Sequence, residues 1–389
     1  MRRTGLFLAT ACLAMSVSAV LSAQSVFRSA VHDYRVVTVA ENLIQPWAIA
    51  FLPGGDALIT ERPGRLRILR QGKLLPNAVE GVPAVFHSSQ GGLLEVMPHP
   101  NFASNRLLYL SFAKPGATEA EAHTTLVRGR FENDRLTQVQ TLFEAVHQGR
   151  NHFSGKIAFD RNGYLFLTVG DRQVPPEGNL EAHPAQNLSN HHGKIIRLHD
   201  DGRVPADNPF VSRAGAKPEI WSYGHRNVQG LAIHPDTGEL WADEHGPQGG
   251  DELNRIEPGK NYGWPVIGFG VNYTTGLAIH SGTHRQGMEQ PLKIWVPSIG
   301  ISGMLFYTGD RFPQWKNNLF VGGMNGQQLS RLTLNGRQVT NEELLVQRMG
   351  RIRDIRQGPD GFIYLVTDDR DGKPTPILRI EPVDRLGTR

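Results

Sequence analysis

The chain has 389 residues, enough for two or three domains or for one large β-rich unit, and its formal net charge at pH 7 is only +4. Its hydrophobic content of 39% excludes a disordered chain, and its 43 glycines are too few for collagen, which needs glycine at every third position. The lysines and arginines are scattered and form no run interleaved with aromatic residues, so we do not expect nucleic acid as a partner.

The N-terminal segment has the three parts of a secretory signal peptide: an arginine pair, an apolar run that ends at Leu21, and small residues up to Ala23. We expect cleavage after Ala23, which removes residues 1–23 and leaves residues 24–389 as the mature protein, in the periplasm or outside the cell. A buried first helix or a membrane anchor is the alternative. Cleavage also removes Cys12, the only cysteine, so the mature protein has no disulfide. We expect no membrane span in the mature chain.

The rest of the chain repeats a loose unit of two apolar strands joined by a turn that contains Pro, Asp or Gly. Six copies occur at irregular intervals, and no linker separates them. The pattern predicts an all-β fold, a six-bladed β-propeller with long inter-strand loops, over residues 24–389. A β-sandwich with coincidental turns is the alternative. The copies lie at residues 48–60, 94–110, 157–168, 231–241, 304–321 and 355–367.

Propeller ligands usually bind at one end of the central channel, where loops from several blades meet. We therefore expect the site residues to be scattered along the chain, with one group in each blade. The common motifs for phosphate-binding loops, for zinc proteases and for serine hydrolases are absent from the sequence. Five local clusters of polar residues stand out instead.

The first cluster is QGGLL at residues 90–94, in which Gln90 precedes a glycine pair and an apolar strand. The glycine pair is typical of a tight turn, and a turn alone accounts for the motif. The side-chain amide of Gln90 can also donate and accept hydrogen bonds, so it is a candidate contact for a polyol such as a sugar.

The second cluster is NHFSG at residues 151–155. His152 stands at the start of a strand, and Asp171 follows the next strand of the same unit, so both side chains lie in one blade. The carboxylate of Asp171 can orient the imidazole and stabilise its cation, which makes His152 a plausible general base. A histidine with purely structural hydrogen bonds is the alternative.

The third cluster is WSYGHRNVQG at residues 221–230, where Arg226 stands beside Asn227 in a loop bounded by glycines. A guanidinium group next to side-chain amides is suited to hold an anion or a carbonyl oxygen. A surface arginine that caps a strand is the alternative.

The fourth cluster combines DEHGPQGGDELN at residues 243–254 with GKNYGWP at residues 259–265. Its carboxylates and its glycine and proline carbonyl groups are hard oxygen ligands of the kind that calcium prefers. The spacing does not match an EF-hand, so it does not specify a metal site by itself.

The fifth cluster is GRIRD at residues 350–354. In a strand, Arg351 and Arg353 point to the same side. Two guanidinium groups on one face repel each other unless an anion lies between them. Pairing with Asp354 or with another acid is the alternative. Together, the five clusters suit a polyanionic cofactor held by arginine and metal, with a base that faces a hydroxyl substrate.

Taken in order, these motifs resemble those of the PQQ-dependent sugar dehydrogenases, specifically the soluble aldose dehydrogenase branch of the glucose/sorbosone dehydrogenase family. The resemblance extends from residue 46 to residue 368, nearly all of the mature chain. The matching motifs are QGGLL at 90–94, WSYGHRN at 221–227, EHGP at 244–247, NYGWP at 261–265 and RIRD at 351–354.

The resemblance implies an enzyme that oxidises the C1 hydroxyl of aldose sugars to lactones. Its cofactor would be pyrroloquinoline quinone (PQQ), a tricarboxylated ortho-quinone, bound with calcium at the channel mouth. His152 would take the proton from the C1 hydroxyl, Asp171 would orient His152, and the hydride would pass to the C5 carbonyl of the quinone. Arg226 would stabilise the oxygen that gains charge there, Asn227 would contact the cofactor, and Gln90 would contact the sugar.

The same resemblance implies two calcium sites. The backbone carbonyl groups of Gly246 and Pro247 would ligate the calcium that accompanies the cofactor. Glu252 and the carbonyl group of Tyr262 would ligate a second, structural calcium.

Two positions depart from the family pattern. Asn151, at a candidate sugar-binding position, stands where glucose-oxidising relatives carry an aspartate. The family also has a cofactor-binding lysine in the loop that matches residues 322–327, where this chain has Asn325. We predict weaker PQQ retention or a neighbouring cation in its place, because Arg351 and Arg353, which would pair with the cofactor carboxylates, remain.

Two other functions are left open by the sequence. A calcium-dependent lactonase-type propeller hydrolase would need several carboxylates converging on the channel and would leave Arg351 and Arg353 unused. A non-catalytic, glycan-binding propeller would not need the pair of His152 and Asp171. The sugar dehydrogenase needs an external electron acceptor, which the sequence does not identify, and it would be a monomer or a homodimer.

Overall fold

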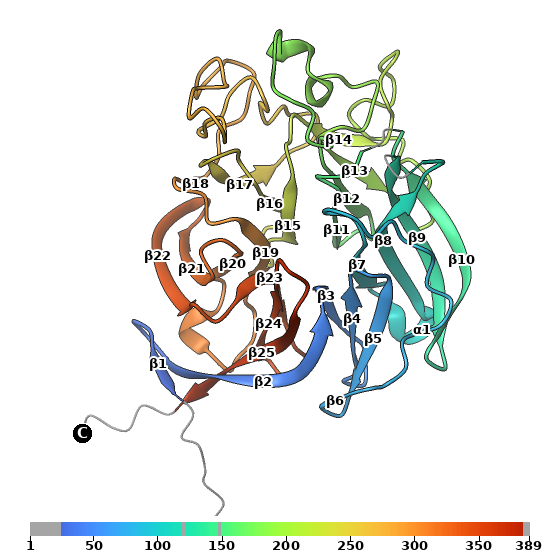
Figure 1. Ribbon diagram of the computed structural model, residues 1–389, viewed down its shortest axis with the longest axis vertical. Helices are drawn as coiled ribbons and strands as arrows, with labels where there is room; N and C mark the ends of the chain where they lie inside the picture. Colours follow the sequence, from blue (N-terminus) through green and yellow to red (C-terminus); the bar gives the residue numbers. More distant parts are fainter. Residues whose placement is uncertain (1–24, 119–120, 147–148, 384–389) are drawn as a thin grey trace, which may run out of the picture.

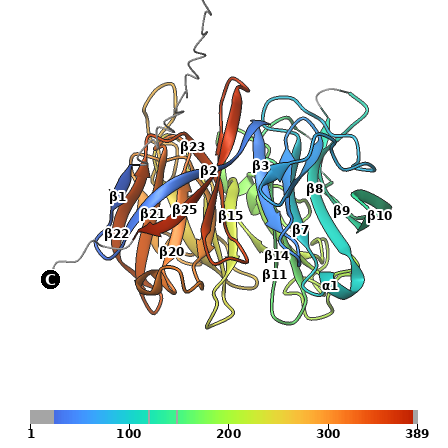
Figure 2. The same cartoon turned by 90° about the horizontal axis from the view of Figure 1, so that it is seen from below.

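The computed structural model describes residues 25–118, 121–146 and 149–383, and within them the chain forms six antiparallel β-sheets around a central axis (Figure 1). The sheets are the blades of a six-bladed β-propeller, which confirms the predicted fold class. Seen from the edge, the strands cross the thickness of the disc and the loops leave it on both faces (Figure 2). The predicted signal peptide, residues 1–23, lies outside the described residues.

Blades 1 to 5 each consist of four strands that follow one another along the chain. Blade 1 comprises β3 (Pro46–Phe51), β4 (Ala57–Glu61), β5 (Arg65–Arg70) and β6 (Lys73–Leu74). Blade 2 comprises β7 (Leu93–Pro98), β8 (Leu107–Pro115), β9 (Ala122–Glu132) and β10 (Arg135–Glu144). Blade 3 comprises β11 (Ser154–Phe159), β12 (Leu165–Val169), β13 (Lys194–Leu198) and β14 (Ile220–Tyr223). Blade 4 comprises β15 (Val228–Ile233), β16 (Leu240–Glu244), β17 (Asp251–Ile256) and β18 (Lys293–Trp295), and blade 5 comprises β19 (Ile301–Phe306), β20 (Leu319–Gly323), β21 (Gln328–Asn335) and β22 (Gln338–Gln347).

Blade 6 closes the ring by joining the two ends of the described chain. Its inner strands are β23 (Arg351–Gln357), β24 (Ile363–Asp368) and β25 (Pro374–Val383), and the N-terminal strands β2 (Asp33–Ile44) and β1 (Val26–Arg28) complete it. The blue β2 runs beside the red β25 in Figure 1, and the two strands pair from Asp33 with Val383 to Ile44 with Pro374. A closed ring leaves no inner strand edge exposed.

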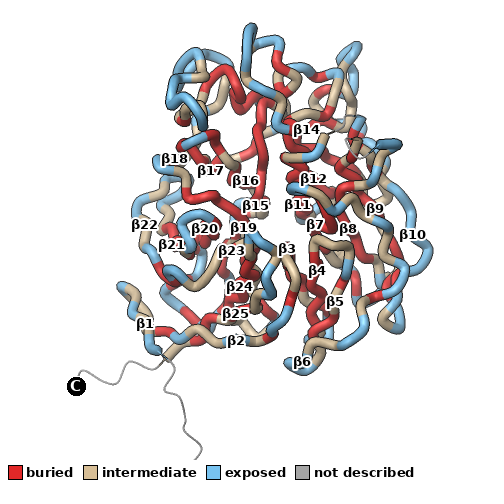
Figure 3. The backbone as a smooth tube through the Cα atoms, viewed as in Figure 1, coloured by how far each residue is buried: buried red, intermediate tan, exposed pale blue. Residues whose placement is uncertain are grey.

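The six sequence repeats are the first two strands of the six blades, as for residues 157–168 in β11 and β12. The first strands of neighbouring blades contact one another around the axis. Because these strands are buried on both faces, they appear in the sequence as short continuous apolar runs. The outer strands β10 and β22 carry many exposed residues instead (Figure 3).

Long loops leave the blades at several points, as predicted. The longest connect β12 to β13 (residues 170–193), β13 to β14 (199–219) and β17 to β18 (257–292). The helical segments are short: α1 (Phe102–Asn105), η1 (Leu180–Ala182), η2 (Pro184–Gln186) and η3 (Pro313–Trp315). Across the described part of the chain, no helix has the length and apolar character that a membrane span requires.

Buried charges join three blades across the channel. The Nζ atom of Lys156 on β11 lies 2.8 Å from the carboxylate of Asp354 on β23 and 3.2 Å from that of Glu95 on β7. Arg356 donates to Glu95 at 2.8 Å, so two cations face two carboxylates. The Lys156 ammonium also lies 4.2 Å from the centre of the Trp47 ring, and Trp47 lines the cavity described next.

Candidate active site

A cavity of about 430 Å³ lies where the innermost strands of all six blades come together. Each blade contributes lining residues to it, as expected for a ligand site at the end of a propeller channel. One representative from each blade, in chain order, is Trp47, Leu94, Ser154, Gln229, Met324 and Arg353.

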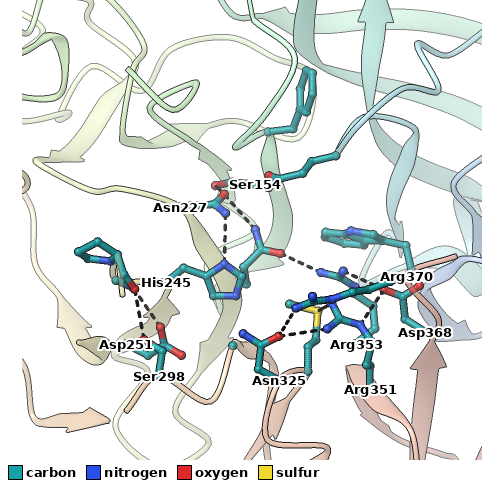
Figure 4. Close-up of a pocket in the computed structure, with 18 of the residues that line it drawn as sticks. Ser154, Asn227, His245, Asp251, Ser298, Asn325, Arg351, Arg353, Asp368 and Arg370 are labelled. Carbon is teal, nitrogen blue, oxygen red and sulfur yellow. Dashed lines mark hydrogen bonds and ion pairs between the residues drawn. The ribbon is translucent and has the colours of Figure 1, made fainter. Parts of the chain in front are cut away.

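Four arginines line this cavity: Arg62, Arg351, Arg353 and Arg370. Arg351 and Arg353 point to the same side of β23, as predicted, and both face the carboxylate of Asp368 (Figure 4). Arg353 donates to Asp368 at 3.0 Å, whereas the Nε atom of Arg351 lies 3.8 Å away.

The arginines outnumber the acid that pairs with them. Burial, and then the charge of Arg353, lowers the pKa of Arg351 to about 10, which means that its cation is destabilised in the free protein. The Nε atoms of Arg351 and Arg353 are buried without a hydrogen-bond partner. The alternative of a pair bridged by acids therefore holds only in part: Asp368 bridges them, while Asp354 lies in the channel network. Unpartnered donors and repelling cations favour an anionic ligand in this cavity.

His152 and Asp171 form a buried pair, as predicted. The Nδ1 atom of His152 donates to the Asp171 carboxylate at 2.6 Å, and the two side chains are 5% and 0% exposed. Asp171 also accepts hydrogen bonds from the indole of Trp264 at 2.7 Å and from the Gln173 amide at 2.8 Å. These bonds fix the imidazole so that its Nε2 atom carries the free lone pair.

The electrostatic surroundings keep this pair in the state that a general base requires. Burial, and then the charges of Arg226 and Arg172, lowers the pKa of His152 against the opposing effect of Asp171, so the imidazole is neutral at neutral pH. Burial alone would raise the pKa of Asp171, but contact with His152 and the charge of Arg226 hold it below its usual value. His152 is thus a neutral acceptor held by an ionised carboxylate.

A second cavity, of about 240 Å³, borders this pair. Its lining includes His152, Asp171 and Arg226, and it shares Pro247 and Tyr273 with the arginine-lined cavity. The two cavities are therefore neighbours. Molecules bound in both would meet beside His152.

Arg226 lines the smaller cavity beside His152 and Asp171. Its backbone amide donates to Glu244 at 2.7 Å, which anchors the loop, and its guanidinium lies 5.2 Å from the centre of the Trp264 ring. The Nε atom is buried without a partner. The neighbouring Asn227 lines the larger cavity and accepts a hydrogen bond from Ser154 at 3.2 Å. Arg226 can thus hold an oxygen that gains negative charge.

The predicted cofactor calcium ligands, Gly246 and Pro247, lie in the loop between β16 and β17 and line the larger cavity. Their carbonyl oxygens receive only long hydrogen bonds, 3.5 Å from the Tyr273 hydroxyl and 3.5 Å from the Ser298 hydroxyl. Both oxygens keep lone pairs for a cation.

Glu252 and Tyr262, the predicted second calcium site, line a third cavity of about 20 Å³ together with Glu244, and this cavity shares Gly246 and Pro247 with the larger one. Burial, and then the nearby charge of Glu244, raises the pKa of Glu252 to about 8. Buried Glu244 and half-buried Glu252 lie around one small space, where their carboxylates repel each other, and a bound cation would relieve that repulsion. Within the residues that the structure describes, no three side chains of His, Cys, Asp or Glu form a metal-binding group.

Gln90 and Asn151, the predicted sugar contacts, are engaged in holding the segment that carries the base. The side-chain oxygen of Gln90 accepts the backbone amide of His152 at 2.9 Å, and Gln90 lines the larger cavity. Asn151 donates to Gln173 at 2.6 Å and accepts from the Ser89 hydroxyl. Neither cavity is lined by Asn151.

Sequence reasoning did not find Arg62, Arg370 or Asp368 in the larger cavity. Arg62 donates to the carbonyl of Gly91 at 3.0 Å, and Arg370 donates to the Asn325 side chain at 2.7 Å. Each of these residues stands in an unremarkable polar turn or at a strand end, so its local sequence carries no signal. Only the closed ring brings them together.

Residues 43–379 match the family described as Glucose / Sorbosone dehydrogenase. The aldose sugar dehydrogenase YliI of Escherichia coli K12 is 42% identical over 355 residues, which cover 89% of this chain and 92% of that protein. A crystal structure of a glucose dehydrogenase is 47% identical, with a TM-score of 0.83 over 88% of this chain and 98% of its own. The PQQ-bound aldose sugar dehydrogenase of Streptomyces coelicolor is 29% identical, with a TM-score of 0.72 over 90% of this chain and 98% of its own.

Proposed function

The chain belongs to the glucose/sorbosone dehydrogenase family and is a sugar-oxidising oxidoreductase, and on that premise we propose that it uses PQQ and calcium to oxidise the C1 hydroxyl of aldoses to lactones. The observation that carries the proposal is the cavity lined by four arginines beside the cavity that His152 lines. The arginine-lined cavity suits a polyanionic cofactor, and the cavity lined by His152 suits a small hydroxyl compound.

The larger cavity fits PQQ by charge. A tricarboxylate would supply the anions that Arg351 and Arg353 lack, and it would hydrogen-bond to the unpartnered Nε atoms. Arg62 and Arg370 add positive charge on the same cavity. The solved relative from Streptomyces coelicolor, which binds PQQ, supports the same assignment.

The cofactor calcium would be held by oxygen atoms of the loop between β16 and β17. Gly246 and Pro247 line the larger cavity, and their carbonyl groups would hold the calcium beside the cofactor. Glu252, with its raised pKa, and the Tyr262 carbonyl would hold the second, structural ion. A hard cation there would offset the repulsion between Glu252 and Glu244.

The residues around the base would carry out the proton transfer. The Nε2 atom of His152 would take the proton of the C1 hydroxyl, and Asp171 would stabilise the imidazolium that forms. Bound PQQ would supply the two-electron oxidation by accepting the hydride of C1, and the electrons would then pass to an external acceptor. Arg226 would stabilise the oxygen that gains charge, which is usually the largest catalytic contribution.

The direct test is reconstitution of the purified apoprotein. With PQQ and calcium added, we expect reduction of an electron-accepting dye by at least one aldose in a panel, and no reduction when PQQ is omitted. Removal of calcium by a chelator before PQQ addition should prevent activation. Absence of dye reduction with every aldose would refute the proposal. Hydrolysis of lactones with calcium alone would instead support a lactonase-type propeller. If the protein showed neither activity, the glycan-binding propeller would be the remaining alternative.

We propose that Arg370 is the neighbouring cation that replaces the missing lysine. The Arg370 guanidinium reaches the Asn325 side chain at 2.7 Å, so a cation lies beside the position where the family carries lysine. We expect Arg370→Gln to weaken PQQ binding by about three- to fivefold, since an exposed ion pair contributes at most about 1 kcal/mol. Titration of the apoprotein with PQQ, followed by fluorescence, measures the change.

Asn325→Lys provides the matched comparison. In the wild-type background it should change PQQ affinity little, because Arg351 and Arg370 already surround Asn325. In the Arg370→Gln background it should restore the affinity. If it raises affinity equally in both backgrounds, Arg370 is not the substitute.

We also propose that the protein is exported by the segment at residues 1–23 and acts in the periplasm or outside the cell. Mass determination of the mature N-terminus tests the predicted cleavage after Ala23.

A further inference from the structure

The segment that carries the base has a strained backbone. His152 and Ser154 both have left-handed conformations, with φ values of 46° and 57°, although neither is glycine. Such conformations cost free energy and persist only where the surroundings hold them. The contacts around His152 should therefore show what keeps its imidazole in place.

Arg172 provides the strongest of these contacts. Its Nη1 atom donates to the carbonyl of His152 at 2.6 Å and to that of Asn151 at 3.2 Å. The guanidinium lies 4.2 Å from the centre of the Phe153 ring and also donates to the Thr124 hydroxyl. Arg172 thus contacts three consecutive residues of the base segment: Asn151, His152 and Phe153.

Among the residues that the structure describes, none forms an ion pair with Arg172. The residue is only 6% exposed, and its hydrogen bonds to these residues all go to neutral oxygen atoms. Burial lowers its pKa to about 9, partly offset by the charge of Asp171. Burying a guanidinium group to donate hydrogen bonds to two carbonyl groups costs free energy, and this cost points to a role beyond packing.

Asp171 and Arg172 are consecutive, and they hold the two ends of His152: Asp171 binds the imidazole and Arg172 binds the backbone carbonyl. Gly170, just before them, approaches so closely that a Cβ atom there would lie 2.0 Å from the carbonyl oxygen of His152. The segment at residues 170–172 therefore fixes both the position and the orientation of the base.

We propose that Arg172 is a positioning residue of the active site, which holds the strained backbone of His152 so that the imidazole meets the sugar hydroxyl. The proposal rests on His152 acting as the base. The charged and titratable groups that face His152 are Asp171, Arg226, Arg172 and His245. Of these, Arg172 is the one that also holds the backbone.

Arg172→Met tests the proposal, because it removes the charge and the hydrogen bonds but keeps the length. We expect kcat to fall about 10²-fold, since a displacement of about 1 Å costs that much, with little change in the KM for sugar or in PQQ affinity. We also expect the pKa of His152 to rise, because a nearby cation is lost. NMR titration of the apoprotein with labelled histidine, assigned through His152→Ala, measures this pKa independently of activity.

Arg172→Lys separates charge from geometry. It keeps the positive charge but loses the planar fork, so the pKa of His152 should stay near the wild-type value while kcat still falls about tenfold. If Arg172→Met does not fold, Thr124→Val removes a hydrogen-bond partner of Arg172, and a smaller fall in kcat is expected.

Arg197→Met is the control. Arg197, on β13 of the same blade, is 5% exposed and stacks 3.8 Å from the centre of the Tyr164 ring, but it lines neither cavity. It should lower the melting temperature without changing kcat or the pKa of His152. If Arg172→Met behaves in the same way, Arg172 is merely structural. If the wild-type protein oxidises no sugar, the proposed function fails, yet the NMR titration still decides whether Arg172 acts on His152.

Discussion

Replacement of His152 by alanine is expected to lower turnover by about 10²–10⁴-fold, the contribution of a well-positioned general base. The side chain is buried, its Nδ1 atom is committed to Asp171, and His152 lines the smaller cavity, so we expect no other group to accept the proton of the sugar hydroxyl. PQQ affinity should be nearly unchanged, because His152 does not line the arginine-lined cavity. Steady-state kinetics and a PQQ titration of the same variant measure both quantities.

The wild-type pH profile provides a second readout of the same residue. Burial and the neighbouring cations lower the pKa of His152, and the base must be neutral to act. Activity should therefore be fully present at neutral pH and decline as the pH falls through that pKa, with the midpoint of kcat/KM below about 6.5. A midpoint well above this value would mean that His152 is not the titrating base.

His191→Ala is the matched control for His152→Ala. His191 belongs to the same blade and forms a buried pair with Glu219 at 2.7 Å, but it lines neither cavity. Losing this pair should lower the stability of the protein and leave turnover within about twofold of wild type. Equal loss of turnover in both variants would show that the effect of His152→Ala comes from the fold and not from the base.

The fold could be predicted because the inner strands of a propeller are buried on both faces. That burial produces the apolar pairs of strands, such as β11 and β12, that recur six times in the sequence. The closure of the ring could not be predicted in the same way. It pairs β2 with β25, which are separated by almost the whole chain, and most residues of β2 are exposed or half-buried, with no local mark of its partner.

The contact between His152 and Asp171 could be predicted because the two residues flank adjacent strands, so strand order alone brings them together. The contacts that support the pair leave no comparable trace. Arg172 acts on backbone carbonyl groups, which every residue has, and its partners therefore have no characteristic side chains. Arg62 and Arg370 reach the arginine-lined cavity from turns of other blades, and their positions depend on loop geometry that the local sequence does not encode.

Simultaneous replacement of Arg351 and Arg353 by glutamine is expected to weaken PQQ binding by about 10²–10⁴-fold. Each hydrogen bond to a charged group contributes about 1.5–3 kcal/mol, and 1.4 kcal/mol corresponds to a factor of ten. Both side chains are largely buried, at 17% and 12% exposure, so solvent would not screen their interaction with cofactor carboxylates. Isothermal titration of the apoprotein with PQQ measures the loss.

Arg331→Gln serves as the control for the arginine pair. Arg331 is a buried arginine of blade 5 that pairs with Glu343 at 2.5 Å and lines neither cavity. It should lower the melting temperature of the apoprotein and leave PQQ affinity unchanged.

The single variant Arg351→Gln distinguishes a ligand site from a structural pair by the sign of its effects. In the free protein, Arg351 is repelled by Arg353 and lies 3.8 Å from an Asp368 that Arg353 already holds at 3.0 Å. Removing Arg351 should therefore leave the melting temperature of the apoprotein unchanged or higher, while the stabilisation that PQQ provides becomes smaller. A structural arginine would give the opposite result: a lower melting temperature in the apoprotein and an unchanged increment on PQQ addition. That outcome would remove the basis for placing the cofactor carboxylates here.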